Sequence, residues 1–172
     1  MRKIFFLVLL VALLAVSGVD AARVNLAHTN PVDYINKLNP TLPKEMGENF
    51  FPTPVVVPQY SDATSKLYIL YIASDEATAM VRFTTDSNDF IRSIVTISSN
   101  DDQGINMAGQ VAFVLATGLN LSGEELLKIF KQDHTKGDYK VLSSQNGIYI
   151  NLSTQVDANN NLFGIFITGT DS

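Results

Sequence analysis

Residues 66–99 alternate between three runs of strand-forming side chains and two short polar breaks. The runs are rich in Ile, Val, Tyr, Phe and Thr, whereas Asp, Asn and Ser in the breaks favour turns. This pattern predicts an antiparallel meander of three strands. The expected strands cover residues 67–74, 78–85 and 90–99.

The turns decide which side chains of this meander share a face. A second turn centred on Ser87 predicts Phe83 opposite Ile91 and Arg82 opposite Arg92. With a two-residue first turn, the face that carries the arginines would also include Leu67, Ile69, Tyr71, Met80 and Ile94. Both faces are then largely apolar, which predicts that both are covered.

The hydrophobic period changes after residue 104. Apolar and small residues recur at helical spacing between residues 105 and 119, at Ile105, Ala108, Ala112, Leu115 and Leu119. Residues 122–125 (Ser-Gly-Glu-Glu) match a capping box ahead of a second apolar run, and Gly137 would end that helix. The segment therefore predicts a helical hairpin.

Strand patterns return after Asp138. Apolar and polar residues alternate over residues 148–156, turn-forming residues follow at 157–161, and residues 162–168 form a last apolar run. The whole pattern predicts an α+β fold. Along the chain, a strand meander, a helical hairpin and a second meander would follow one another. The two meanders would form an antiparallel sheet, with the helices packed on one face.

The first twenty-two residues match a secretory signal peptide. Arg2 and Lys3 precede an apolar run at residues 4–16, and small residues lead to a cleavage point after Ala21 or Ala22. At about 1.5 Å per residue, the run is too short to cross a hydrocarbon core of roughly 30 Å. We therefore expect a protein exported to the periplasm or secreted, without a transmembrane span after cleavage. Zero cysteine in an exported chain favours a bacterial source.

Residues 23–65 are rich in proline and precede the expected α+β domain at residues 66–172. Asn30 and Pro31 predict a short helix over residues 31–38, with Asn30 as its cap. Residues 50–58 must be extended, because their prolines disfavour helix and exclude a central strand. We expect this Phe- and Val-rich stretch to lie against an apolar surface.

Composition and motifs exclude several chemistries. The 172 residues carry a net charge of −5, which argues against a nucleic-acid partner, and the lack of cysteine excludes thiol catalysis and zinc–thiolate sites. Serine-hydrolase and phosphate-loop motifs do not occur in the sequence, and His28 and His134 stand at no known ligand spacing. Asp157 begins a calcium-like pattern that lacks the turn glycine, so a hairpin loop explains it better. We expect no cofactor, metal or catalytic residue, although distant carboxylates that meet in space stay open.

One constellation suggests binding. Arg82 and Arg92, beside Tyr71 and Met80, would offer two guanidinium groups on an apolar face and could hold a carboxylate. The simpler interpretation pairs the arginines with Asp86, Asp89 or Glu45.

The resulting prediction is an exported, non-catalytic module that binds a protein, a peptide or an envelope component. One alternative is a carrier of a small apolar or anionic ligand, with a pocket between the sheet and residues 50–58. An unrecognised hydrolase is a third reading. A second copy of the chain is a further candidate for covering the second apolar face.

Overall fold

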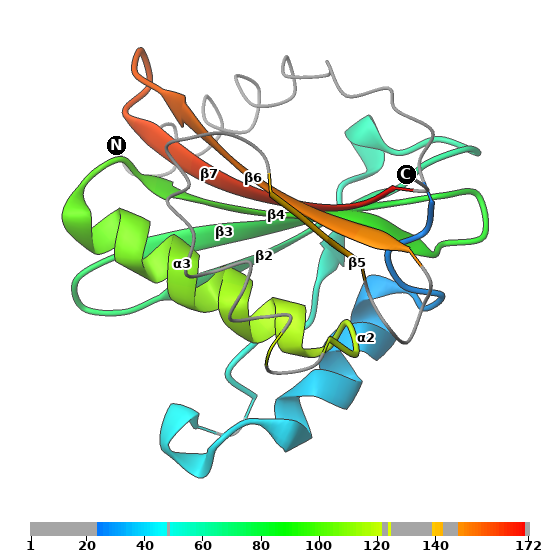
Figure 1. Cartoon of the computed structure of the whole chain (residues 1–172), viewed down its shortest axis with the longest axis horizontal. Helices are drawn as coiled ribbons and strands as arrows, with labels where there is room; N and C mark the ends of the chain where they lie inside the picture. Colours follow the sequence, from blue (N-terminus) through cyan, green and yellow to red (C-terminus); the bar gives the residue numbers. More distant parts are fainter. Residues whose placement is uncertain (1–23, 48, 122–123, 125–138, 143–147, 171–172) are drawn as a thin grey trace.

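A computed structural model describes residues 24–47, 49–121, 124, 139–142 and 148–170 (Figure 1). The expected signal peptide, the second helix of the expected hairpin and His134 lie outside these residues. The described chain forms a seven-stranded sheet in the order β1-β2-β3-β4-β7-β6-β5. The strands are β1 (Val55–Val56), β2 (Leu67–Ala73), β3 (Thr78–Thr85), β4 (Ile91–Ser99), β5 (Tyr139–Leu142), β6 (Tyr149–Asp157) and β7 (Leu162–Thr170).

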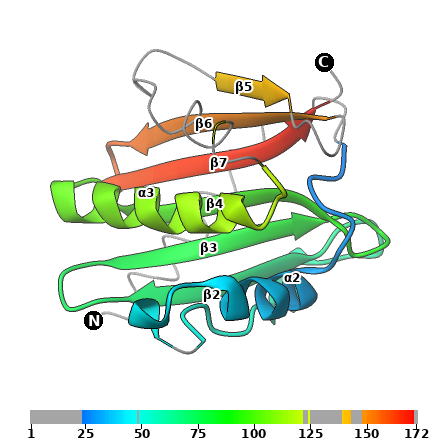
Figure 2. The same cartoon turned by 60° about the horizontal axis from the view of Figure 1, so that its bottom comes forward.

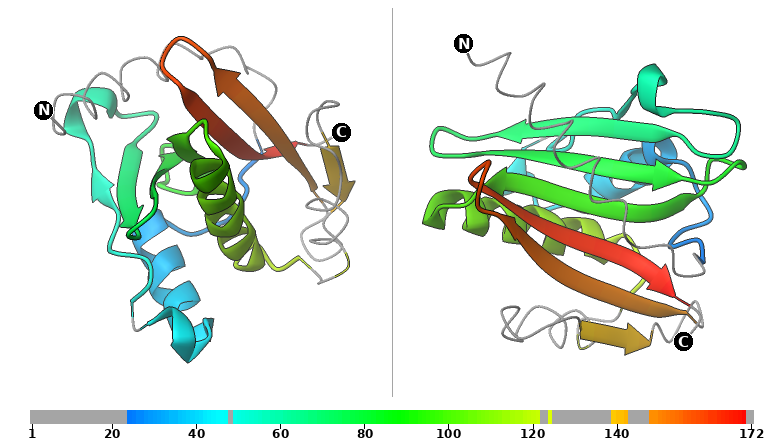
Figure 3. Two further views of the ribbon diagram at one scale, coloured as in Figure 1. Left: turned by 90° about the vertical axis from the view of Figure 1, so that its left-hand side faces the viewer. Right: turned by 90° about the horizontal axis from the view of Figure 1, so that it is seen from above.

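Every pair of neighbouring strands is antiparallel. The first meander, β2-β3-β4, and the second, β5-β6-β7, join where β4 pairs with β7 in the middle of the sheet (Figure 2). The two helices longer than one turn that the described residues form lie on the same side of the sheet (Figure 3). The α+β class and the antiparallel sheet are therefore confirmed.

Helices α2 and α3 each begin after a residue whose side chain caps the helix; of these two caps, the sequence predicted Asn30. Helix α2 (Pro31–Leu38) starts after Asn30, whose side chain accepts a hydrogen bond of 2.9 Å from the backbone N–H of Asp33. Helix α3 (Asp102–Thr117) starts after Asp101, which accepts one of 2.8 Å from Gly104. Three short 3-10 helices complete the described helical segments: η1 (Asn39–Thr41), η2 (Lys44–Met46) and η3 (Pro58–Tyr60).

Helix α3 packs closely on β4 through small residues and side-chain hydrogen bonds. The hydroxyl of Ser98 donates to the carbonyl of Gly104 at 2.7 Å, and Thr96 donates to the carbonyl of Ala108 at 3.3 Å. This contact turns Gly104 toward the sheet and leaves Ile105 beside the buried stripe, 37% exposed. Ile105, which helical spacing groups with the other apolar positions, is therefore exposed, whereas those four positions are buried.

The N-terminal segment shares the main core with the helices and the sheet. Leu26, Ile35 and Phe51 are each 1% exposed and lie in the cluster that α3 and the strands build. Isolated bridges join Val24 to Gly169 and Ala27 to Ile91.

Residues 50–58 run along the border of the sheet. They contribute β1, which pairs with β2 at one end of the strand order, as the prolines predict. Phe51 points into the main core, while Val57 belongs to a separate buried cluster. The segment therefore contacts apolar side chains of both clusters.

Candidate functional site

The face of the sheet opposite α2 and α3 carries the candidate site, and we call it the second face. Residues paired across strands lie side by side on one face, so the register arranges this face in rows. One row contains Ile69, Arg82, Val95, Phe166 and Ser153. The next contains Tyr71, Met80, Ile97, Gly164 and Gln155. On the other side, a polar row contains Thr84, Ser93, Thr168 and Asn151.

The second face has an apolar floor with partly exposed groups around it. Met80, Val95 and Ile97 are at most 2% exposed and form a buried cluster of their own. Ile69 and Phe166 are half-buried against this cluster, and Tyr71 is 39% exposed. Partly exposed apolar groups beside a buried floor can contact a ligand or a partner.

The predicted sharing of this face is confirmed in part. Tyr71 pairs directly with Met80, and Arg82 lies in the adjacent row on the same face. Ile94 instead lies on the helix side, in the main core. The expected pairing of Phe83 with Ile91 is also wrong, because Phe83 pairs with Ile94.

The two arginines lie on adjacent strands but are not directly opposed. Arg82 pairs with Val95, and Arg92 falls at a register shift, where Ser93 and Ile91 pair with consecutive residues of β3. Arg92 is therefore offset by three positions from Val95, the partner of Arg82, or about 10 Å along the strand. The offset avoids placing like charges directly opposite each other, which destabilises a sheet.

The cause of the shift is the turn between β3 and β4. Asp86 donates its N–H to the carbonyl of Phe90, and the N–H of Asp89 donates to the carbonyl of Asp86. Asp89 has a φ of 67°, which aspartate tolerates better than most residues. The turn is thus longer than one centred on Ser87, and β4 starts in another register.

Two buried polar atoms stand out on the second face. Within the described residues, Nε of Arg92 and Oδ1 of Asn151 are buried and have no hydrogen-bond partner. A buried polar group without a partner costs about 1–3 kcal/mol, so such atoms call for an explanation. Asn151 belongs to the polar row and Arg92 is next to Ser93 of that row. A cationic donor and an amide acceptor therefore lie unpaired in or beside this row.

Burial also affects the other arginine. It lowers the pKa of Arg82 below the usual value of the guanidinium, because removal from water disfavours the charged form. A cation in such a place is stabilised by an anionic or hydrogen-bonding neighbour.

Asp86 is buried close to Arg92. Burial alone would raise the pKa of Asp86, but the N–H groups of Phe90 and Asn88, the amide of Asn25 and the charge of Arg92 together hold it below its usual value. Arg92 therefore has a nearby negative charge, which agrees in part with the simpler interpretation of the arginines.

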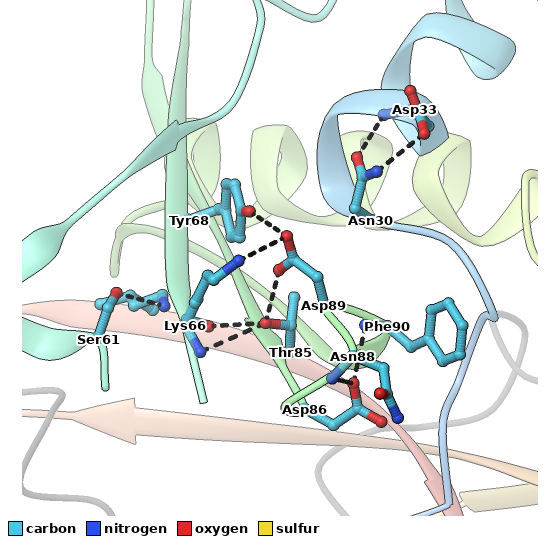
Figure 4. Close-up of polar contacts among 11 residues, drawn as sticks. Asn30, Asp33, Ser61, Lys66, Tyr68, Thr85, Asp86, Asn88, Asp89 and Phe90 are labelled. Carbon is cyan, nitrogen blue, oxygen red and sulfur yellow. Dashed lines mark hydrogen bonds and ion pairs between the residues drawn. The ribbon is translucent and has the colours of Figure 1, made fainter. Parts of the chain in front are cut away.

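Asp89 organises the other end of the same turn (Figure 4). It accepts hydrogen bonds from Tyr68 at 2.7 Å, Lys66 at 3.0 Å and Thr85 at 3.0 Å. Burial tends to raise the pKa of Asp89, but these bonds and the charge of Lys66 outweigh it and lower the pKa. Asp89 thus forms its ion pair with Lys66. This cluster holds the turn, and through it the register of β4.

The remaining candidates have structural explanations. Asp157 accepts hydrogen bonds from the backbone of Asn159 and from the backbone and side chain of Asn160, as a hairpin loop requires. His28 stacks on Phe90 with ring centroids 5.3 Å apart. Across the described ranges, no three His, Asp or Glu side chains are grouped so that they could hold a metal ion.

No protein-family model, curated protein or solved structure matches the chain. In the part of the chain that the structure describes, no helix is both long enough and apolar enough to span a membrane. Functional inference therefore rests on the chemistry of the chain's own residues.

Proposed function

We propose that the chain is an exported, non-catalytic binding module. Its second face would hold a peptide segment of a partner protein that carries apolar side chains and a carboxylate. The observation that carries this proposal is the polar row, where Arg92 and Asn151 have buried polar atoms without hydrogen-bond partners among the described residues.

The second face has a matching surface for the apolar side chains of such a segment and another for its carboxylate. Apolar side chains of the partner would contact Ile69, Tyr71 and Phe166 beside the buried floor. Its carboxylate would accept hydrogen bonds from a guanidinium group, which can donate two parallel N–H groups to one carboxylate. Two arginines on one face of a chain with net charge −5 favour an acidic group at that place.

Export is supported by the amino-terminal pattern. The basic residues, the apolar run and the small residues before Ala21 and Ala22 have the order of a signal peptide. A binding protein outside the cytoplasm would meet its partner after cleavage of this leader.

Photo-cross-linking tests the binding face. A benzophenone amino acid would replace Tyr71 or, as the control, Ile105 on α3, because the two side chains are 39% and 37% exposed. We expect an adduct with a partner from the Tyr71 position and none from the Ile105 position. Replacing both arginines of the face, Arg82→Gln and Arg92→Gln, should remove the adduct.

A thermal melt of each variant separates binding from folding. Arg92→Gln alone serves as a milder second variant, since Arg92 lies at the register shift near the start of β4. Lys44→Gln, an exposed substitution in η2, is the matched control for loss of one positive charge. Equal adducts from both cross-linker positions, or an adduct that survives the double substitution in a folded protein, would contradict the proposal.

A further inference from the structure

A cavity of about 790 Å³ lies on the helix side of the sheet. It is bounded by residues 24–29, by α2 and η1, and by the C-terminal end of α3. Ligand sites for small molecules commonly enclose about 300–1,000 Å³. Val24, Ala27 and Ile148 are half-buried and give the cavity an accessible apolar wall, behind which Leu26, Leu38 and Leu119 are buried.

Most polar side chains in the lining already have partners. Tyr34 donates to a carbonyl of α3, and Asn25 donates to Asp86. The hydroxyls of Thr41 and Thr117 donate to carbonyls of their own helical turns at 2.7 and 2.6 Å. These groups form the wall and have little left to offer to a ligand.

The carbonyls at the end of α3 are also occupied. The carbonyl of Leu115 accepts from the hydroxyl of Tyr34 and from the N–H of Gly118, and the carbonyl of Ala116 accepts from Leu119. This capping weakens the negative end of the helix dipole on that side of the cavity. An anion is therefore less disfavoured there than at an uncapped helix end.

The lining keeps three polar side chains without a hydrogen bond to any described residue: His28, Lys37 and Asn120. The stacking of His28 on Phe90, with 28° between the ring planes, fixes the orientation of the imidazole. Lys37 is the basic residue in the last turn of α2. Asp33, one turn earlier, exchanges hydrogen bonds with Asn30 instead.

The charge of the lining points to one class of ligand. The described residues that line the cavity include a lysine and a histidine but neither aspartate nor glutamate. The free groups include N–H donors and a positive charge, and the wall is apolar. An amphipathic molecule with an anionic end satisfies both.

We propose that this cavity binds a small amphipathic carboxylate, with its hydrocarbon part on Val24, Ala27 and Ile148 and its carboxylate at Lys37 and His28. This inference goes beyond the proposed function, because the cavity and the second face lie on opposite sides of the sheet. The two sites can therefore be tested separately.

Isothermal titration of the purified protein with dodecanoate tests the cavity, and dodecanol is the uncharged probe of the same chain length. We expect saturable binding of both probes, with dodecanoate about fivefold tighter, as an exposed ion pair allows. Lys37→Gln should lower the affinity for dodecanoate about fivefold and leave the affinity for dodecanol unchanged. Lys44→Gln, in η2 outside the lining, should change neither affinity.

A second pair of variants fills the space. Thr117→Phe places a large side chain in the lining and should abolish binding of both probes. Gln110→Phe adds the same side chain two turns earlier on α3, at an exposed position outside the lining, and should leave binding intact. Thermal melts establish that both variants fold.

The results that would overturn the proposal are also distinct. Absence of saturable dodecanoate binding, or binding that Thr117→Phe leaves unchanged, would exclude the cavity as the site. Equal losses in Lys37→Gln and Lys44→Gln would exclude the assigned carboxylate contact. Loss of dodecanoate binding in Arg82→Gln would show that the probe binds at the second face. That result would overturn the proposed cavity site and leave the proposed function intact.

Discussion

Gly104, near the start of α3, leaves no room for a Cβ against the end of β4, and alanine there should destabilise the fold. A Cβ at this position would lie 2.2 Å from the carbonyl oxygen of Ser99 and 2.4 Å from its hydroxyl. Ordinary contacts begin at 3.4 Å, so the start of the helix would have to move by about 1 Å. Two hydrogen bonds resist that movement, from Ser98 to the carbonyl of Gly104 and from the N–H of Gly104 to Asp101.

The size of the effect follows from two opposed contributions. Overpacking in a rigid region costs about 1–3 kcal/mol, and a clash with backbone belongs at the upper end. The higher helix propensity of alanine returns up to about 1 kcal/mol. The net loss should therefore be about 2 kcal/mol, which lowers the melting temperature of a chain of this size by roughly 4–8 °C.

Gly109, in the same helix, provides the matched control. A Cβ there meets no atom within 4 Å, so Gly109→Ala should gain helix propensity without a clash. Thermal melts followed by circular dichroism should show a rise of roughly 2–4 °C for Gly109→Ala. The packing argument is refuted if Gly104→Ala melts at or above the parent protein, or if both variants fall equally.

Three further predictions concern buried hydrogen bonds. Asp89→Asn removes a charge that accepts three hydrogen bonds and should cost about 2 kcal/mol in urea unfolding. Because the folded state lowers the pKa of Asp89, this stability is present above about pH 4 and is lost as the pH falls through the folded-state pKa. A gap between variant and parent that does not narrow as the pH is lowered below about 4 would contradict this reasoning. Tyr34→Phe removes the donor to a carbonyl of α3 and should cost about 1 kcal/mol, whereas Tyr60→Phe, at a 37% exposed position, should cost nothing measurable. Ser98→Ala should lower the free energy of unfolding by about 1 kcal/mol. An unchanged urea midpoint would show that the hydrogen bond from Ser98 to Gly104 does not stabilise the fold.

Local signals predicted the elements well. Asn30 and Pro31 place the start of α2 correctly, because a cap and a fixed φ act on neighbouring residues only. The prolines near Val55 likewise confine β1 to the border of the sheet. Such features depend on a few adjacent residues and can be read without the rest of the fold.

The register of β4 could not be obtained in this way. It depends on the turn after β3, where Asp89 takes a positive φ and accepts hydrogen bonds from Lys66, just before β2, and from Tyr68 within β2. Asn25, 61 residues earlier in the chain, donates to Asp86 in the same turn. These contacts form only when the fold is complete, so the turn pattern alone misplaced Arg92 relative to Arg82.

The polar row could not be predicted from the sequence either. Ser93, Thr168 and Asn151 come together because β4 pairs with β7 and β7 pairs with β6. Pairing between two meanders leaves no periodic signal in either one. The second-face residues of β2 and β3, in contrast, were predictable, because the two-residue turn between these strands sets their pairing.

A native mass spectrum of the protein recovered from the exported fraction tests the central claim most directly. We predict a chain that begins at Ala22 or Arg23, with a bound partner whose added mass disappears in the Arg82→Gln, Arg92→Gln double variant. Retention of Met1 would contradict export. An exported chain that carries no partner, or whose partner survives the double substitution, would contradict binding at the second face.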